Sequence, residues 1–224
     1  MKKLLPLFLA MLTCLPSCYL LQREAVQRYF RKKALDATFA LYEQDSGDEA
    51  RFVCSATIFW RERISHEFRY LLITAGHCVS DISEESRFTV AKEIGATLLP
   101  VEVMRWKLGD DEDFAELELR TTQKFPALVL AKKYDGQRGD AIFCANFSDG
   151  LSEQAAEGRI SSEVFENFNE RKKRLFLAHI FGAPGISGAA VVSERTHEII
   201  GIVTTGFGRN LGFGVEPMSR KVID

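Results

Sequence analysis

The alternation of apolar and polar residues along most of the chain is typical of short β-strands. From about residue 38 onward, segments rich in Val, Ile, Phe, Thr and Leu are separated by polar or glycine-bearing turns, with little helical periodicity. About a dozen such segments occur, among them FRYLLITAG, FAELELR, AIFCANF and EIIGIVTTGF. This pattern predicts an all-β architecture of two sheets or two barrels.

The first 36 residues have a different pattern. Lys2 and Lys3 precede an apolar run from Leu4 to Leu12, as in the n-region and h-region of a secretory signal. The run is shorter than the roughly 20 apolar residues that a membrane-spanning helix needs. Residues 1–18 are therefore predicted to be a signal, lipoprotein leader or anchor. Residues 19–36, which are charged and contain neither Gly nor Pro after residue 21, are predicted to be a helical tether.

The end of this leader leaves the fate of the N-terminus open. The tetrapeptide LPSC, which ends at Cys18, resembles a bacterial lipobox, in which the cysteine is acylated. Pro16 is unusual inside such a box, so an ordinary cleaved signal and an uncleaved anchor remain alternatives to lipidation. In each case we expect an exported protein, either secreted or in the cell envelope, with membrane attachment through the N-terminus as one alternative.

The length and charge of the chain limit the kinds of protein that it can be. A chain of 224 residues with 46% hydrophobic content can bury one large core. Its 29 Lys and Arg residues are mixed with 31 Asp and Glu residues, for a net charge of −2. No basic face for nucleic acid is expected, because such a face needs clustered cations.

Three polar residues stand at positions where catalytic groups are found. His77 follows the apolar strand in LLITAGHCV, Asp113 begins the alternating segment DFAELELR, and Ser187 lies in the glycine-rich GAPGISGAA. Taken singly, each is more typical of a structural residue. Together they supply a nucleophile, a base that activates it, and a carboxylate that orients the base.

These motifs, in the order His, Asp, Ser, resemble those of the trypsin-like (chymotrypsin-fold, clan PA) serine peptidases. TAGHC resembles the family's Thr-Ala-Ala-His-Cys, DFAELEL its Asp-hydrophobic-Ala-x-Leu strand, and GISGAAVV its Gly-x-Ser-Gly-Gly-Pro followed by an apolar strand. EIIGIVTTG is similar to the strand along which the substrate backbone pairs. The resemblance covers residues 37–224 and implies two six-stranded antiparallel β-barrels, preceded by the leader and a short helix.

The resemblance also implies a mechanism. Ser187 would be the nucleophile, His77 the general base and then acid, and Asp113 the orienting carboxylate. The backbone N–H groups of Gly185 and Ser187 would form the oxyanion hole. The reaction would proceed through an acyl-enzyme on a protein or peptide substrate, without a metal or organic cofactor.

The resemblance to this family also suggests how two of the cysteines are paired. Cys54 in RFVCSATIF and Cys78 beside the histidine resemble a pair that is disulfide-bonded in the family, which suits an exported protein. Two reduced, buried thiols are the alternative. Cys144 has no evident mate and is predicted to be a small core residue.

The sequence departs from the family pattern at positions that matter for activation in the digestive members. Ile186 stands where the digestive members have an Asp that pairs with a freshly cut N-terminus, and no Arg-Ile-Val-Gly-Gly site occurs. The closer resemblance is therefore to the bacterial HtrA-like members, here without their PDZ domain.

The residues expected around the substrate side chain are apolar. Phe181 is at the position that forms the base of the specificity pocket in the family, and Thr204, Thr205 and Gly206 match its wall. Because a Lys or Arg in a dry pocket needs a counter-charge, cleavage is expected after small or medium apolar residues.

Two other functions are alternatives to a peptidase. A peptidase-fold binding protein with little or no activity stays open, because Ala189 replaces a family glycine and would cost about 1 kcal/mol if its φ were positive. An α/β-hydrolase esterase does not fit, because its order is Ser, Asp, His.

Overall fold

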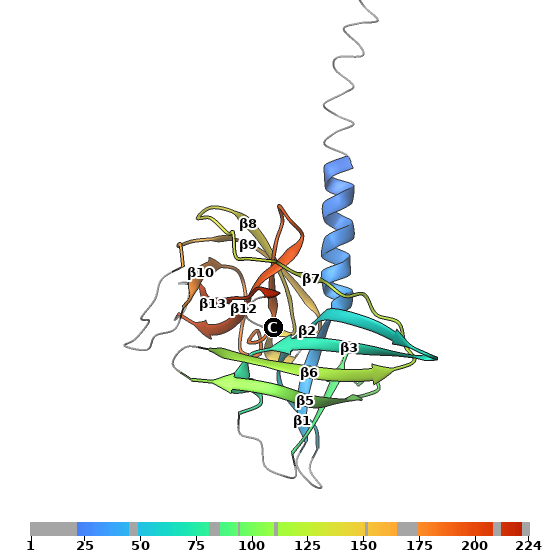
Figure 1. The fold of residues 1–224 in the computed structure, drawn as a ribbon. Helices are drawn as coiled ribbons and strands as arrows, with labels where there is room; N and C mark the ends of the chain where they lie inside the picture. The colour runs from blue at the N-terminus through green and yellow to red at the C-terminus, as the bar shows by residue number, and fades with distance from the viewer. Residues whose placement is uncertain are drawn as a thin grey trace, which may run out of the picture.

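The computed structural model describes residues 22–44, 49–80, 86–93, 95–109, 112–150, 152–164, 174–207 and 212–220. Within these residues a helix over residues 22–37 is followed by 13 strands and two short 3₁₀ helices (Figure 1). The predicted leader with Cys18 lies outside the described residues. In the part of the chain that is described, no helix is both long and apolar enough to cross a membrane.

The first six strands form a closed barrel in which every pairing is antiparallel. The order around the barrel is β1-β2-β3-β6-β5-β4. Its strands are β1 (Thr38–Gln44), β2 (Arg51–Ile64), β3 (Glu67–Thr74), β4 (Arg87–Ala91), β5 (Leu99–Leu108) and β6 (Asp113–Thr121). Alternation places one side of each strand inside the barrel, where Phe39, Leu72 and Leu117 are fully buried.

A second ring of six antiparallel strands follows. It runs β11-β8-β9-β10-β13-β12 and closes through a β11–β12 pairing. Its strands are β8 (Ala141–Asn146), β9 (Gln154–Ile160), β10 (Phe176–His179), β11 (Ala190–Ser193), β12 (Glu198–Gly206) and β13 (Phe213–Pro217). The predicted architecture of two six-stranded barrels is therefore confirmed. One strand departs from it, because β7 (Val129–Leu130) pairs with β12 in parallel.

Two apolar clusters hold the barrels together. One fills the first barrel and continues to residues of the second, including Phe143, Val192 and Ile202, so it also joins the two units. The other fills the second barrel around Phe176 and Val203. Cys144 belongs to this second core: it is a free, fully buried thiol, as predicted, and burial raises its pKa to about 12.

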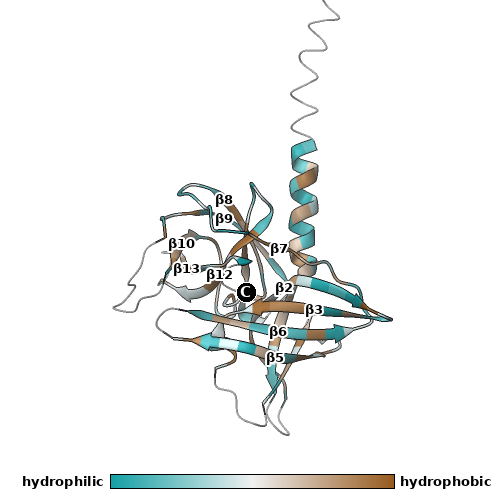
Figure 2. Ribbon diagram, viewed as in Figure 1, coloured by the Kyte–Doolittle hydropathy of each residue, from teal (hydrophilic) through white to brown (hydrophobic). Residues whose placement is uncertain are grey.

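The helix over residues 22–37 packs against the body at its C-terminal half. Figure 2 shows hydrophilic and hydrophobic residues interspersed along this helix. Ala34 and Ala37 are buried, and the Phe30 ring stacks on the His197 ring with centroids 3.9 Å apart. Arg31 forms ion pairs with Glu157 and Glu194 of the second barrel. This half of the helix is therefore docked on the barrels.

Candidate active site

His77 lies where the chain leaves the first barrel. Strand β3 ends at Thr74, and the short helix η1 (Gly76–Cys78) follows at once. A Cβ at Gly76 would lie 2.0 Å from the backbone oxygen of Lys107, so only glycine fits against β5 there. The turn leaves the His77 side chain 36% exposed.

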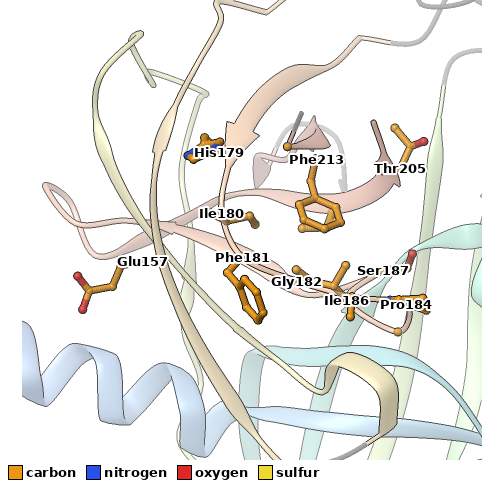
Figure 3. Close-up of a pocket in the computed structure, with 15 residues that line it drawn as sticks. Glu157, His179, Ile180, Phe181, Gly182, Pro184, Ile186, Ser187, Thr205 and Phe213 are labelled. Carbon is orange, nitrogen blue, oxygen red and sulfur yellow. The ribbon is translucent and has the colours of Figure 1, made fainter. Parts of the chain in front are cut away.

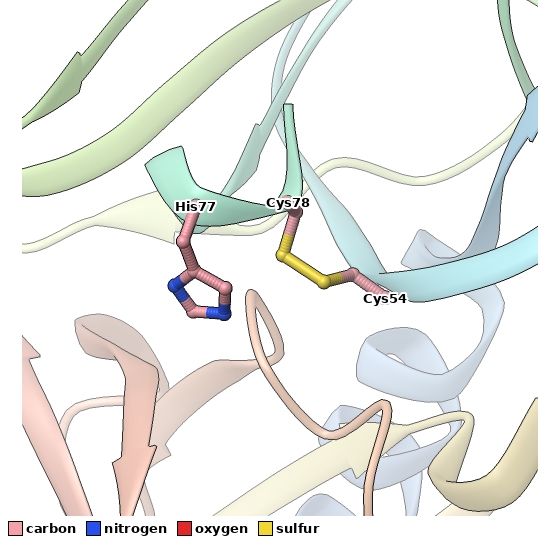
Figure 4. Close-up of side chains that lie close together, drawn as sticks. All are labelled: Cys54, His77 and Cys78. Atoms are coloured by element: carbon pink, nitrogen blue, oxygen red, sulfur yellow. A yellow bond between two sulfur atoms is a disulfide. The ribbon is translucent and has the colours of Figure 1, made fainter. Parts of the chain in front are cut away.

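A disulfide fixes the far end of this turn. Cys78 is bonded to Cys54 of β2, so the predicted pairing is confirmed (Figure 4). A ring nitrogen of His77 lies within 4.8 Å of both sulfurs, a grouping that could suggest a metal site. Cysteine binds metals as a thiolate, and these two sulfurs are bonded to each other. The group is better explained as a structural cross-link beside the imidazole.

Asp113 and His77 are joined by hydrogen bonds. Asp113 begins β6 and is buried, and its Oδ1 accepts the backbone N–H of His77 at 2.9 Å. His77 Nδ1 lies 3.2 Å from Oδ1 and 3.1 Å from Oδ2 of the same carboxylate. A carboxylate facing Nδ1 favours the tautomer with the proton on that nitrogen, which leaves Nε2 as the basic atom.

Ser187 is carried by a loop that packs against the strand leading to His77. A Cβ at Gly188 would lie 2.1 Å from Thr74 Oγ1 and 2.3 Å from the Ser55 backbone oxygen. Gly188 also has a φ of +78°, which glycine adopts without strain. Within the described residues no hydrogen bond joins the Ser187 hydroxyl to His77. The structure thus places Ser187 beside the His77 turn with its hydroxyl not bonded to the imidazole.

The backbone around Ser187 leaves two N–H groups without a backbone acceptor. The N–H groups of Ile186 and Gly188 donate to the carbonyls of Ala183 and Val203. Those of Gly185 and Ser187, in the described part of the chain, have no backbone partner. Gly185 has a φ of +93°. Such free N–H groups on a glycine-containing turn can bind an oxyanion.

A neighbouring loop sets the direction of the Gly185 N–H. The Pro184 carbonyl accepts the backbone N–H of Asp149 at 2.6 Å. In a trans peptide the carbonyl and the next N–H point in opposite directions, and the described chain has no cis peptide. The Gly185 N–H therefore points away from η2 (Ser148–Gly150), which contains Asp149.

A cavity of about 760 Å³ opens beside Ser187 (Figure 3). Apolar side chains that line it include Ile180, Ile186, Val203 and Phe213. Of the four residues predicted to contact the substrate, Phe181, Thr205 and Gly206 line the cavity and Thr204 does not. Phe181 is 77% exposed, so it lies at the rim and not at the expected base of the pocket.

Ala189 does not have a positive φ. Among the described residues other than glycine, only Ser65, Asp149 and His197 have a positive φ. Ala189 is fully buried beside the loop in an ordinary conformation. The cost that would have favoured an inactive protein therefore does not arise at this residue.

Ser55 is a site residue that sequence reasoning missed. Its hydroxyl donates to the Gly185 carbonyl at 2.9 Å and accepts the Phe147 N–H at 3.0 Å. Its backbone N–H donates to the Ser187 carbonyl at 2.9 Å, and its carbonyl accepts the Thr74 hydroxyl at 2.8 Å. One buried residue of β2 thus contacts the Ser187 loop and the end of β3. In the sequence, the only sign of this role is that Ser55 directly follows Cys54 in the RFVCSATIF motif.

Glu216 was missed as well. It is 5% exposed, and its Oε2 accepts the backbone N–H of Asp113 at 2.8 Å, which links β13 to β6. The only sign in the sequence was an acidic residue inside the otherwise apolar strand FGVEP.

Comparison with known proteins agrees with the double-barrel fold. Residues 54–202 match the profile of the family described as trypsin-like peptidase domain. No curated protein matches. One similar solved structure is an HtrA-type protease, AlgW, with a decapeptide, which has a TM-score of 0.68 and 18% identity. Another is AlgW with a tripeptide, with a TM-score of 0.65 and 20% identity.

These alignments bear on the fold alone at such low identity. Both alignments cover 88% of this chain, but only 64% of the first AlgW chain and 60% of the second. The chain therefore spans less than two thirds of the length of these proteases.

Proposed function

The chain belongs to the family of trypsin-like peptidase domains, and we propose that it is a serine endopeptidase that uses Ser187, His77 and Asp113. The observation that carries the proposal is the His77–Asp113 contact, in which Nδ1 faces a buried carboxylate beside the loop that bears Ser187. A serine hydroxyl needs a base within reach, and a base held in one tautomer meets that need.

The proposed reaction gives each of these groups a defined role. His77 Nε2 takes the proton as the Ser187 oxygen attacks the scissile carbonyl, and Asp113 stabilises the imidazolium. The N–H groups of Gly185 and Ser187 donate to the oxyanion. His77 then gives this proton to the leaving amine. In the second half of the reaction His77 takes a proton from a water molecule as that water attacks the acyl carbonyl, and it returns the proton to the Ser187 oxygen when the acyl group leaves.

We propose a protein or peptide substrate with a small or medium apolar residue before the cleaved bond. The apolar lining of the cavity beside Ser187 supports this preference. Glu157 also lines the cavity; it pairs with Arg31, which it shares with Glu194, and its side chain is 64% exposed. A carboxylate that is mostly in contact with solvent is a weak counter-charge for a basic substrate residue.

The Cys54–Cys78 disulfide supports a further proposal, that the protein acts outside the cytosol. Disulfides persist in oxidising compartments and are rare in the cytosol. Export, with or without lipidation at Cys18, can be tested by locating the full-length protein in fractionated cells and analysing the mass of its mature N-terminus.

A fluorophosphonate probe tests the proposed nucleophile directly. We expect the full-length protein to be labelled on Ser187 and the Ser187→Ala variant to remain unlabelled. With a peptide substrate, Ser187→Ala or His77→Ala should lower kcat by about 10⁶. If the correctly folded protein is not labelled, a peptidase-fold binding protein is the better explanation.

A further inference from the structure

A second cavity, of about 900 Å³, lies away from Ser187 and shares no lining residue with the cavity there. It is bordered by the helix over residues 22–37, by β2, by the segment that leads into β7, and by Arg220. We call it the basic groove; its lining residues include Tyr29, Lys33, Trp60, Arg61, Lys124 and Arg220. None of them takes part in the proposed peptidase chemistry.

The charges that line the basic groove all have one sign. Its charged residues are Lys33, Arg61, Lys124 and Arg220, and no acidic residue of the described chain lines it. This bias does not reflect composition, because Asp and Glu slightly outnumber Lys and Arg in the whole chain. Four cations around one cavity repel one another until an anion neutralises them.

In the described residues, these four cations also lack the acidic partners that neighbouring cations have. In the described part of the chain, none of the four forms an ion pair. On the same helix, by contrast, Arg31 pairs with glutamates of the second barrel, and Lys32 pairs with Asp36 at 2.8 Å. Arg61 Nη1 donates to the Phe125 carbonyl at 2.9 Å, which orients its guanidinium without neutralising it.

Aromatic rings complete the walls. Tyr29 is 64% exposed and Trp60 is 37% exposed, and both line the groove. Exposed rings beside cations provide a flat apolar surface on which a planar ligand group can stack. The volume lies within the range of about 300–1,000 Å³ that is typical of small-molecule sites.

We propose that the basic groove binds a small organic anion that carries two or more phosphate groups and a planar ring. The cations would contact the phosphates, since Arg and Lys are the usual phosphate ligands, and Trp60 or Tyr29 would stack on the ring. A phosphate could also come from a lipid headgroup, and the experiment separates the two sources. This proposal does not depend on the protein being an active peptidase.

Binding can be measured by calorimetry on the full-length protein with metal-free ATP and with pyrophosphate as probes. We expect both to bind one per chain, ATP more tightly, and both more weakly as salt increases. Charge reversal by Lys124→Glu with Arg61→Glu should weaken ATP binding by at least about tenfold, because charge-assisted hydrogen bonds are the strong ones. Trp60→Ala should remove most of the advantage of ATP over pyrophosphate.

The matched control is Lys132→Glu with Lys133→Glu, which makes the same change in net charge at two exposed residues outside the groove. It should leave ATP binding within about twofold of the unmodified protein. Thermal unfolding of each variant establishes that it is folded.

Three results would overturn the proposal. One is the absence of saturable binding of either probe to the folded protein. A second is an equal loss of affinity in the control variant, which would mean non-specific attraction. The third is binding to phosphatidylglycerol vesicles that depends on Lys124 and Arg61, without binding of soluble probes, which would identify a lipid headgroup site.

Discussion

The backbone N–H of Asp113 donates a hydrogen bond to the carboxylate of Glu216, across the boundary between the two barrels. Asp113 begins β6 of the first barrel, and Glu216 belongs to β13 of the second. Both side chains are nearly inaccessible to solvent. The carboxylate that contacts His77 is therefore held at its backbone by the opposite barrel. This one contact therefore links the two barrels and also supports the candidate site.

Removing the Glu216 carboxylate should weaken both the fold and the activity. Glu216→Ala leaves a buried N–H without this acceptor, and such a loss costs about 1–3 kcal/mol. We expect a matching decrease in the free energy of unfolding, measured by urea denaturation, and a lower kcat. Glu216→Gln keeps an oxygen acceptor and should lose less of both. Equal losses in the two variants would show that the hydrogen bond is not what matters.

Removing the Ser55 hydroxyl should lower turnover with little change in KM. In Ser55→Ala the Gly185 carbonyl loses a donor, and the loop that presents the two free N–H groups is held less firmly. Since loss of one oxyanion donor costs about 10²–10³ in kcat, a misplaced donor should cost about tenfold or more. Steady-state kinetics on a peptide substrate measures this effect.

Thr57→Val is the matched control for Ser55→Ala. Thr57 is a buried hydroxyl of the same strand, and it contacts the Thr38 hydroxyl at 3.2 Å, away from the Ser187 loop. We expect it to lower stability without a selective loss of kcat. If Thr57→Val reduces kcat as much as Ser55→Ala does, the Ser55 effect is a general loss of packing.

The sequence predicts those residues of the candidate site that lie in recognisable short motifs. It does not predict the contacts between residues that are far apart in the chain. His77 and Asp113 lie at strand ends within short motifs, so their neighbours along the chain identify them as candidates. The contacts of Ser55 and Glu216 depend on how two barrels meet, and strand alternation does not encode that arrangement. The same holds for the parallel pairing of β7 with β12.

The N-terminal helix shows a second limit of sequence patterns. Its charged residues predict a helix, and the described helix covers residues 22–37. The pattern does not predict where it docks, because Arg31 pairs with glutamates more than a hundred residues away. A lone arginine and a lone glutamate give no sign of such pairing in a chain rich in both.

Reduction of the disulfide should destabilise the first barrel. Cys54 and Cys78 are 24 positions apart in the sequence. In the chain-entropy account, cross-linking a loop of this size stabilises the folded state by about 3 kcal/mol. Urea denaturation with and without a reductant measures the difference. The Cys54→Ala, Cys78→Ala double variant is the control, because a reductant should not change its stability.

Cys144 should be unreactive while the protein is folded. Burial raises the pKa of its thiol to about 12, so at pH 8 almost none is thiolate, the reactive form. Iodoacetamide should modify it only in denaturant, as followed by intact mass. Rapid modification of the native protein at pH 8 would contradict the buried environment.

Docking of the N-terminal helix should weaken as the pH falls below about 6.5. Burial lowers the pKa of His197 from its ordinary value of 6.5, partly offset by the Glu194 charge, and the neutral ring stacks on Phe30. A histidine with a lowered pKa in the docked state binds more protons when undocked. Its contribution to docking is therefore complete above pH 6.5 and is lost as the pH falls toward the lowered value.

Hydrogen exchange of the helix between pH 7.5 and 5.5, corrected for intrinsic rates, measures this effect. We expect protection of residues 22–37 to decrease over that range in the unmodified protein. His197→Phe keeps a ring for Phe30 but cannot titrate, so its protection should change much less. The Arg31 ion pairs are common to both proteins and cancel in the comparison. An equal decrease in the variant would place the pH dependence in groups other than His197.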